Sequence, residues 1–194
     1  MAAFENAYQI TSGHEGGYDN DPDDVGGETY KGVARRYYPD WEGWVVIDGY
    51  KANNNPKFPE CLDVNTPLQN MVKKFFKQTY WNLFWGDAIP NQTIANELYD
   101  TAVNMGVSRA IKYLQIGLNV LNRNGKLYAD IVEDGKFGDN TLKALNAYLT
   151  TDGPELLYKV MNILQGMHYI EYMKKSPIQE KFSRGWLERI SFIK

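Results

Sequence analysis

The chain has 194 residues, a formal net charge of −3 at pH 7, and 43% hydrophobic and 14% aromatic residues. This length suits one domain or two small ones with a sizeable core, and the composition is globular rather than disordered. The sequence has no basic stripe, so we do not expect nucleic acid as a partner. No apolar run is long enough to approach a membrane span. The single cysteine, Cys61, excludes an internal disulfide. We expect a monomer.

The first predicted helix ends in an acidic side chain. Its apolar face is predicted by residues spaced three and four apart: Phe4, Ala7, Tyr8 and Thr11. Gly16 and Gly17 would stop this helix, so Glu15 would lie in its last turn. The negative end of the helix dipole disfavours a charged carboxylate there, which favours the protonated form that a general acid needs.

A second carboxyl, Asp24, follows nine residues later in a loop rich in glycine and acids, where it is expected to stay ionised. One protonated and one charged carboxyl are what hydrolysis of a glycosidic bond requires. Gly26, Gly27 and Gly32 allow positive φ, and the intervening Tyr30-Lys31 suits a short hairpin. The same residues also fit a solvated helix end followed by an ordinary acidic turn, although the order of an EF-hand is missing.

These residues carry a resemblance to a known family. The run Glu15-Gly16-Gly17-Tyr18, followed by Asp24-x-Gly26-Gly27-x-Thr29-x-x-Gly32, resembles the signature of the glycoside hydrolase 108 family, the bacterial and phage N-acetylmuramidases of the lysozyme-like superfamily. The Glu, Asp, Thr order is also similar to phage-type lysozymes, where the gap before Thr is one residue longer. The resemblance continues in Tyr80-Trp81, Gly86-Asp87, Asp100-x-Ala102-x-Asn104-x-Gly106, Leu114-Gln115, Asp134-Gly135-x-Phe137-Gly138 and Gly185-Trp186-Leu187-x-Arg189.

The resemblance implies a mainly α, lysozyme-like α+β helical fold with a small β-hairpin after the first helix. It implies a peptidoglycan hydrolase that cleaves the β-1,4 bond between N-acetylmuramic acid and N-acetylglucosamine. Glu15 would protonate the leaving oxygen, Asp24 would activate water or stabilise the transition state, and Thr29 would position that water, with Glu28 as the reserve second carboxylate. The expected substrate-binding residues are Tyr18, Gly27, Tyr30, Trp81 and Trp85. No metal and no cofactor are expected.

Other chemistries remain open or are disfavoured. Glu15 could act alone, as in a lytic transglycosylase, or the chain could be a non-hydrolytic cell-wall-binding or secretion-activator-type protein. Zinc hydrolysis is disfavoured because only His14, His168 and Cys61 could join carboxylates as ligands, and they lie far apart in the sequence. Cys61 lacks the setting that activates a nucleophilic thiol.

The rest of the chain is predicted to be helical. Short helices are expected over 32–38 and 41–50 and longer ones over 66–79, 91–106, 108–118, 152–174 and 182–190, with a loop at 51–59, a dense aromatic cluster at 80–85 and a capped helix after the 134–141 turn. Asp100 and Asn104 lie one helical turn apart and are expected to bond each other or clamp a neighbouring loop.

Gly106 marks the expected boundary between two regions: a lysozyme-like catalytic region, 1–106, and a helical predicted peptidoglycan-binding region, 107–194. Leu114-Gln115 and Asp134-Gly135-x-Phe137-Gly138 are similar to peptidoglycan-binding modules, although such residues also make a good turn whatever the ligand. No Sec signal is visible at Met1-Ala2-Ala3-Phe4. We therefore expect synthesis in a bacterial cytoplasm, from a bacterial or phage gene, and access to peptidoglycan glycan strands by a holin-type or other non-Sec route.

Overall fold

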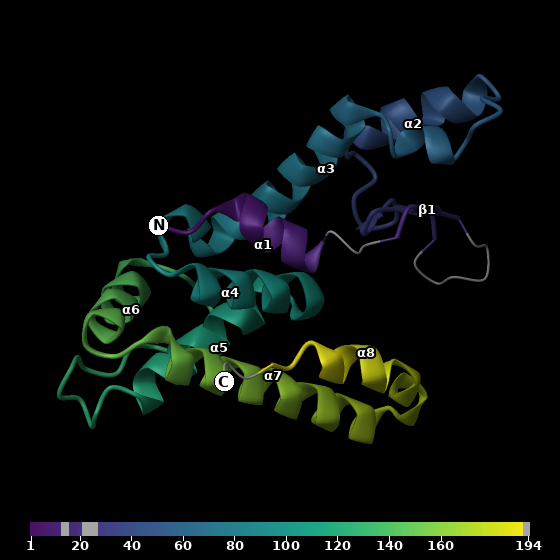
Figure 1. The fold of residues 1–194 in the computed structure, drawn as a ribbon. Helices are drawn as coiled ribbons and strands as arrows, with labels where there is room; N and C mark the ends of the chain where they lie inside the picture. The colour runs from purple at the N-terminus through teal and green to yellow at the C-terminus, as the bar shows by residue number, and fades with distance from the viewer. Residues whose placement is uncertain (13–15, 21–26, 192–194) are drawn as a thin grey trace. The chain divides into compact units, whose positions relative to one another are not determined.

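The computed structural model describes residues 1–12, 16–20 and 27–191. It is mainly α-helical, with a small three-stranded antiparallel sheet after the first helix (Figure 1), which confirms the predicted fold class. The chain divides into two compact units, Tyr8–Thr79 and a larger one made of Met1–Ala7 with Tyr80–Lys194. Helix α1, Phe4–Thr11, begins in the larger unit and ends in the smaller. The predicted division into residues 1–106 and 107–194 stays a prediction.

The smaller unit combines the sheet with two helices. Its strands are β1 (Tyr18–Asp19), β2 (Thr29–Tyr30) and β3 (Val33–Ala34), in the order β1-β2-β3. Helix α2 (Gly43–Ala52) packs on α3 (Thr66–Thr79), and the short 3-10 helix η1 (Glu60–Leu62) joins them. The completely buried side chains of this unit are Tyr30, Val33, Ile47, Leu62, Leu68 and Val72.

The short helix predicted over 32–38 is wrong, because the chain turns back there as a strand. Lys31 and Gly32 both have positive φ, 44° and 78°, and they connect Tyr30 to its partner Val33 as a two-residue hairpin turn. Positive φ at both central positions is the type I′ geometry that matches the twist of paired strands. Val33 is fully buried, so burial and pairing outweigh the weak helical pattern.

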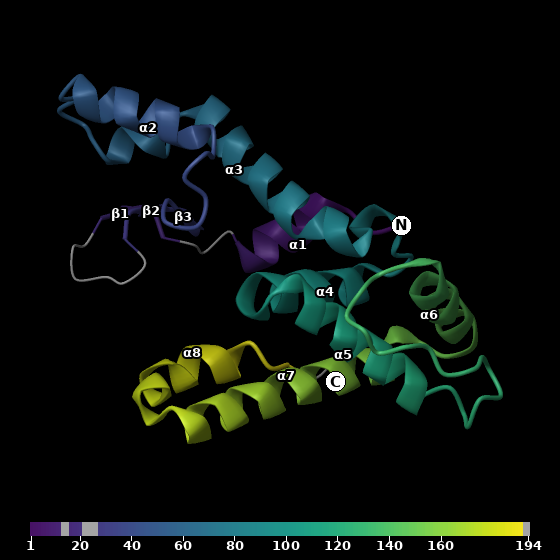
Figure 2. The same cartoon turned by 180° about the vertical axis from the view of Figure 1, so that it is seen from behind.

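The larger unit is a helical assembly. Helices α4 (Gln92–Met105), α5 (Val107–Val120) and α7 (Pro154–Lys175) pack against one another, and α6 (Asp139–Thr151) packs on α5. The 3-10 helix η4 (Pro177–Phe182) and the short α8 (Ser183–Glu188) fold back along α7, as Figures 1 and 2 show from opposite sides. This confirms the expected closing helix and the helices predicted over 91–106, 108–118 and 152–174. The first helix ends at Thr11, so the prediction that it extends to Glu15 is wrong.

Aromatic side chains fill the core of the larger unit where two 3-10 helices, η2 (Trp81–Phe84) and η3 (Gly86–Ala88), precede α4. The ring of Trp81 lies edge to face with Phe4, Phe84 and Tyr99 at centroid distances of 5.7, 5.4 and 6.2 Å. Its indole Nε1 donates to Asp87 at 2.8 Å, so the buried N–H is satisfied. The N-terminus joins this core through Ala2 N–H, which donates to the carbonyl of Ile89 at 2.8 Å.

The Leu-Gln and Asp-Gly-x-Phe-Gly motifs bond each other. The buried amide of Gln115 accepts from Gly135 N at 2.8 Å and donates to Asp134 Oδ1 at 3.0 Å and to the carbonyl of Lys136 at 3.1 Å. Gly135 has φ 69°, and a Cβ there would lie 2.5 Å from the carbonyl oxygen of Ser108. Only glycine fits this turn, so the motif residues hold the turn against α5.

Asp100 clamps distant parts of the larger unit. Arg189 Nη1 lies 2.8 Å from Asp100 Oδ1, and Gln165 donates to Asp100 Oδ2 at 3.2 Å. Asn104 donates to the backbone carbonyl of Asp100 at 2.8 Å and to its carboxylate at 3.4 Å. This confirms the expected bond between the two residues and shows that Asp100 ties α4 to α7 and to the chain end.

Candidate active site

The sequence-predicted site divides into residues that the structure describes and residues that it does not. Glu15 and Asp24, the two predicted catalytic carboxyls, lie outside the described residues. Thr29, Tyr18, Gly27 and Tyr30 all belong to the smaller unit and come together on or beside its sheet. Trp81 and Trp85 belong to the larger unit.

Thr29 lies on β2, the central strand of the sheet. Thr29 lies opposite Asp19 on β1 and opposite Ala34 on β3, and Tyr18 lies opposite Tyr30. The Thr29 side chain is half-buried. Gly27 has φ 67° and open space where a Cβ would stand, so it is glycine for its backbone conformation and not for close packing. Thr29 is thus fixed by strand neighbours on both sides.

Glu28 is the centre of an ionic cluster beside Thr29. Its Oε1 lies 2.6 Å from Lys51 Nζ and accepts a hydrogen bond from the Tyr18 hydroxyl at 2.9 Å. Its Oε2 lies 2.7 Å from Arg35 Nε, a charge contact in which the N–H is not aligned for a hydrogen bond. Arg35 in turn binds Asp48 through both terminal nitrogens, at 3.0 and 2.6 Å. We call Glu28, Arg35, Lys51, Asp48 and Tyr18 the hairpin clamp.

The clamp shifts the protonation equilibria of its members. The hydrogen bonds from Arg35 hold the pKa of Asp48 below its usual value and raise the pKa of Arg35. Burial raises the pKa of Tyr18. Glu28 has a side chain only 13% exposed between two cations, so it serves to anchor the hairpin. The reserve assignment of Glu28 as second carboxylate is disfavoured by this geometry.

Tyr30 was expected to bind substrate, and its burial corrects that expectation. The side chain is completely buried; its hydroxyl donates to the carbonyl of Leu62 at 3.1 Å and accepts from Gln69 at 2.6 Å. Burial raises its pKa to about 12. Tyr30 therefore pins the sheet to η1 and α3. Tyr18, which is half-buried, packs edge to face on Phe58 with ring centroids 4.8 Å apart.

The two expected tryptophans have opposite environments. Trp81 is 0% exposed, so no sugar can stack on its faces, and its assignment as a substrate-binding residue is corrected to a core role. Trp85 is 41% exposed and has φ 53°, a left-handed conformation that turns its ring out of the aromatic core. Its ring lies 5.7 Å from that of Phe137, and with Asn82 and Asp87 it borders a cavity of about 280 Å³. Trp85 is available to a ligand.

Sequence reasoning did not anticipate the partners that hold the hairpin. Arg35 and Lys51 were not assigned any role, since one lies in the segment expected to be helical and the other in the segment expected to be a loop. Lys51 is in the last turn of α2, and Arg35 follows β3 directly. Only their joint position around Glu28 reveals their role, and no local sequence pattern links residues 28, 35, 48 and 51.

Over residues 1–12, 16–20 and 27–191, no group of three His, Cys, Asp or Glu side chains is placed to hold a metal ion. Within the same described chain, no helix has the length and apolar character needed to cross a bilayer. Cys61 is a free, half-buried thiol in η1.

The chain matches two known protein families and a solved structure. Residues 8–106 match the family described as glycosyl hydrolase 108, and residues 109–191 match the family described as predicted peptidoglycan domain. No curated protein matches the sequence. The solved structure of SagA from Brucella abortus is similar to this chain, with a TM-score of 0.60 and 21% identity over 96% of this chain and 88% of SagA, which shows a shared fold. The chain belongs to the glycosyl hydrolase 108 family, and its two matched regions support a glycoside hydrolase directed at peptidoglycan.

Proposed function

We propose that the protein is an N-acetylmuramidase that hydrolyses the β-1,4 bond between N-acetylmuramic acid and N-acetylglucosamine. Glu15 donates a proton to the leaving glycosidic oxygen, and Asp24 activates the attacking water or stabilises the oxocarbenium-like transition state. Thr29 positions that water. Tyr18, Gly27 and Trp85 remain the proposed substrate-binding residues, after Tyr30 and Trp81 are assigned to the core.

The hairpin clamp supports this assignment. The segment that carries Asp24 leaves the sheet after Asp19 and returns at Glu28; Asp19 is paired with Thr29, and Glu28 is held by two cations and a tyrosine hydroxyl. Catalytic groups are commonly carried on loops whose ends are fixed by a rigid scaffold, because small displacements of the reacting groups lower the rate strongly.

The occupied oxygens of Glu28 favour Asp24 as the second carboxyl. A carboxylate that already accepts from Tyr18 and faces Lys51 and Arg35 would have to abandon these partners to activate water. Breaking a largely buried ion pair costs several kcal/mol in general. The observation that carries the proposal is the family match. The hairpin clamp adds to it, because the partners of Glu28 favour Asp24 over Glu28 as the second carboxyl.

The experiment measures the clearing of purified cell walls by wild type and by Glu15→Gln. Loss of a positioned general acid lowers the rate by about 10²- to 10⁴-fold. Glu60→Gln, which neutralises an exposed carboxylate in the same unit, is the matched control and should clear walls at the wild-type rate. If Glu15→Gln clears walls as fast as wild type, the assignment of Glu15 is wrong.

Asp24→Asn separates hydrolysis from a transglycosylase reaction that uses one acid. A hydrolase that depends on Asp24 loses its activity with this substitution. Full activity of Asp24→Asn, with anhydro sugar ends in the products, would mean that Glu15 acts alone as acid and then base.

A second candidate, wall binding without hydrolysis, is favoured by the match of residues 109–191 to a predicted peptidoglycan domain. Sedimentation with purified sacculi, run beside the clearing assay, separates the two. A protein that only binds would sediment with the sacculi and leave their turbidity unchanged.

A further inference from the structure

A cavity of about 380 Å³ lies in the larger unit, and none of its lining residues is among those assigned to catalysis. It is lined by Asn104, Met105, Arg109, His168, Tyr169, Tyr172 and Trp186. These residues come from the end of α4, the start of α5, the second half of α7 and α8, all within one compact unit. The volume is at the lower end of the range of ligand pockets, which suits a small fragment of a polymer.

Three aromatic rings form one wall of this cavity. Tyr169 is 3% exposed and stacks flat on Trp186, with centroids 5.2 Å apart and planes 11° from parallel. Tyr172 is 43% exposed and lies 5.8 Å from Trp186 at an angle of 45°. His168 is parallel to Tyr172, with ring centroids 6.1 Å apart. The wall is therefore rigid at its base, where Tyr169 is fixed, and open at Tyr172.

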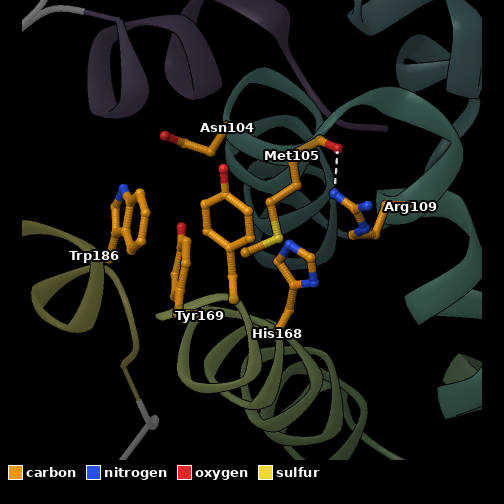
Figure 3. A pocket seen from close by; sticks show the side chains of 7 residues that line it. Asn104, Met105, Arg109, His168, Tyr169 and Trp186 are labelled. Carbon is orange, nitrogen blue, oxygen red and sulfur yellow. Dashed lines mark hydrogen bonds between the residues drawn. The ribbon is translucent and has the colours of Figure 1, made fainter. Parts of the chain in front are cut away.

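Polar side chains complete the lining of the cavity. Figure 3 shows Arg109 and Trp186 at opposite sides of the cavity, with tyrosine rings between them. Arg109 donates from Nη1 to the carbonyl of Met105 at 2.9 Å, and within the described residues no carboxylate is paired with it. The exposed Asn104 amide donates from Nδ2 to the backbone carbonyl of Asp100 at 2.8 Å. A guanidinium in this state keeps further N–H donors for a ligand.

The charge of the cavity is positive. Burial lowers the pKa of His168, and the positive charges of Arg109 and Lys175 lower it further, so the imidazole is neutral at pH 7 and Arg109 is the cation at the cavity. The nearby carboxylate of Asp100 is already compensated, since Arg189 lies 2.8 Å from it. An anionic ligand would be attracted, and planar bidentate binding by arginine selects carboxylate or phosphate.

We propose that this cavity binds a carboxylate of the peptide stem of peptidoglycan, with the peptide backbone lying along Tyr172 and Trp186. Arg109 pairs with the carboxylate, and Asn104 donates to or accepts from a peptide group. The choice of a stem peptide rests on the proposed function. In peptidoglycan the lactyl carboxyl of N-acetylmuramic acid is bound to the stem peptide as an amide, so the free carboxylates are those of the peptide. Asn104 and Met105 belong to the first matched region, 8–106, and the other lining residues belong to the second, 109–191.

The test is calorimetric or NMR titration of the full chain carrying Glu15→Gln, so that no probe is hydrolysed. The probes are a disaccharide–tetrapeptide, the free tetrapeptide, the same tetrapeptide with its carboxyl groups amidated, and the disaccharide without peptide, whose lactyl carboxyl is also amidated so that it carries no charge. We expect both acidic peptides to bind and the amidated peptide and bare disaccharide to bind about tenfold or more weakly, as for loss of a charged hydrogen bond.

Arg109→Gln in the same background should weaken tetrapeptide binding about tenfold to a hundredfold, the range expected for hydrogen bonds to a charged group. Lys112→Gln removes an exposed cation one turn further along α5 and should leave binding unchanged. Arg109→Lys keeps the charge without the planar fork and should lie between the two. In the wild-type chain the Arg109 side chain makes one hydrogen bond within the part of the chain that the structure describes, to the carbonyl of Met105, so its replacement should leave the fold intact. A melting curve of each variant checks this.

The outcomes of the two proposals are separable. The stem-peptide site is overturned if the Glu15→Gln chain binds the tetrapeptide equally well with and without Arg109→Gln. It is also overturned if the amidated tetrapeptide binds as tightly as the acidic one. Failure of every probe to bind at millimolar concentration also overturns it. The comparison of wall clearing by wild type and Glu15→Gln tests the hydrolase, because neither chain alters the cavity. Clearing by Glu15→Gln at the wild-type rate, with intact tetrapeptide binding, would overturn the role of Glu15 and leave the cavity assignment standing.

Discussion

The two compact units are stabilised in different ways. The larger unit buries Trp81, Phe84 and Tyr99 in a continuous aromatic core, and its polar buried groups, such as Gln115, bond backbone that lies close by. The smaller unit holds three two-residue strands by Tyr30 on one side and by the hairpin clamp on the other. Two-residue strands give few ladder bonds, so the hairpin depends on side chains in a way that the helices do not.

The core of the larger unit mainly provides stability, whereas the hairpin clamp of the smaller unit mainly positions residues. Apolar burial, which stabilises the core of the larger unit, is not weakened by Debye screening. Ion pairs that are partly open to solvent are screened and contribute less stability than their number suggests. The hairpin clamp is therefore better understood as a device that fixes where Thr29 and the ends of the Asp24 segment lie. Substitutions should accordingly affect unfolding in the larger unit and catalysis in the smaller one.

The largest expected effect on stability is that of Trp81→Ala. Removing a fully buried tryptophan leaves a cavity and abolishes the hydrogen bond from Trp81 to Asp87, and such changes cost about 3 to 5 kcal/mol. Urea unfolding measures it. If Trp81 instead bound sugar, the variant would unfold like wild type and lose wall affinity, which would return Trp81 to the substrate site.

Glu97 predicts a pH dependence of stability. It is 5% exposed on α4, and burial, followed by repulsion from Asp100, raises the pKa of Glu97 from 4.5 to about 7. Between these two values the folded chain keeps a proton that the unfolded chain has released, so stability falls as pH rises from about 4.5 to about 7, by on the order of 3 kcal/mol in total.

Glu97→Gln, which resembles the protonated carboxyl, should remove most of this slope. Urea unfolding at a series of pH values measures it. Glu188→Gln, an exposed acid on α8, should keep the wild-type slope. A Glu97→Gln chain whose stability still falls over the same interval would show that another group is responsible.

Glu28→Gln tests the hairpin clamp of the smaller unit. The glutamine can still accept from Tyr18 but loses the attraction to Arg35 and Lys51, so we expect a loss of about 1 to 3 kcal/mol in the smaller unit. The clearing rate should fall partly, and more steeply with temperature than that of wild type. A complete loss of activity at unchanged stability would instead make Glu28 the second catalytic carboxylate.

The smallest expected stability change is that of Trp85→Ala. Because Trp85 is 41% exposed and meets Phe137 only at the surface, the variant should unfold within about 1 kcal/mol of wild type. Its affinity for sacculi, measured by sedimentation, should fall if the ring binds sugar. Unchanged sedimentation and clearing would remove Trp85 from the substrate-binding residues.

Much of the fold was predictable because helices repeat their apolar residues. Leu68, Val72, Phe75 and Phe76 outline α3, and the Thr66-Pro67 pair marks its start. The strand at Val33 was missed because two-residue strands carry no period, and their pairing is decided by a hairpin turn and by burial. Composition likewise gave no way to separate Trp81 from Trp85, whose environments differ through one left-handed residue in the backbone.

The candidate sites were predictable to a smaller extent. Short spacing and family resemblance directed attention to Glu15, Asp24 and Thr29. The clamp, by contrast, joins residues 28, 35, 48 and 51, and the aromatic cavity joins residues 104, 109, 168 and 186. Such groupings depend on tertiary packing between distant elements, and no sequence window contains them.

The most direct test of the account is mass spectrometry of the soluble products that the purified chain releases from sacculi. A muramidase that uses Glu15 and Asp24 as proposed releases disaccharide–peptides with reducing N-acetylmuramic acid ends, and Glu15→Gln releases none above background. Free peptides, reducing N-acetylglucosamine ends, or products that are the same for wild type and Glu15→Gln would contradict the account.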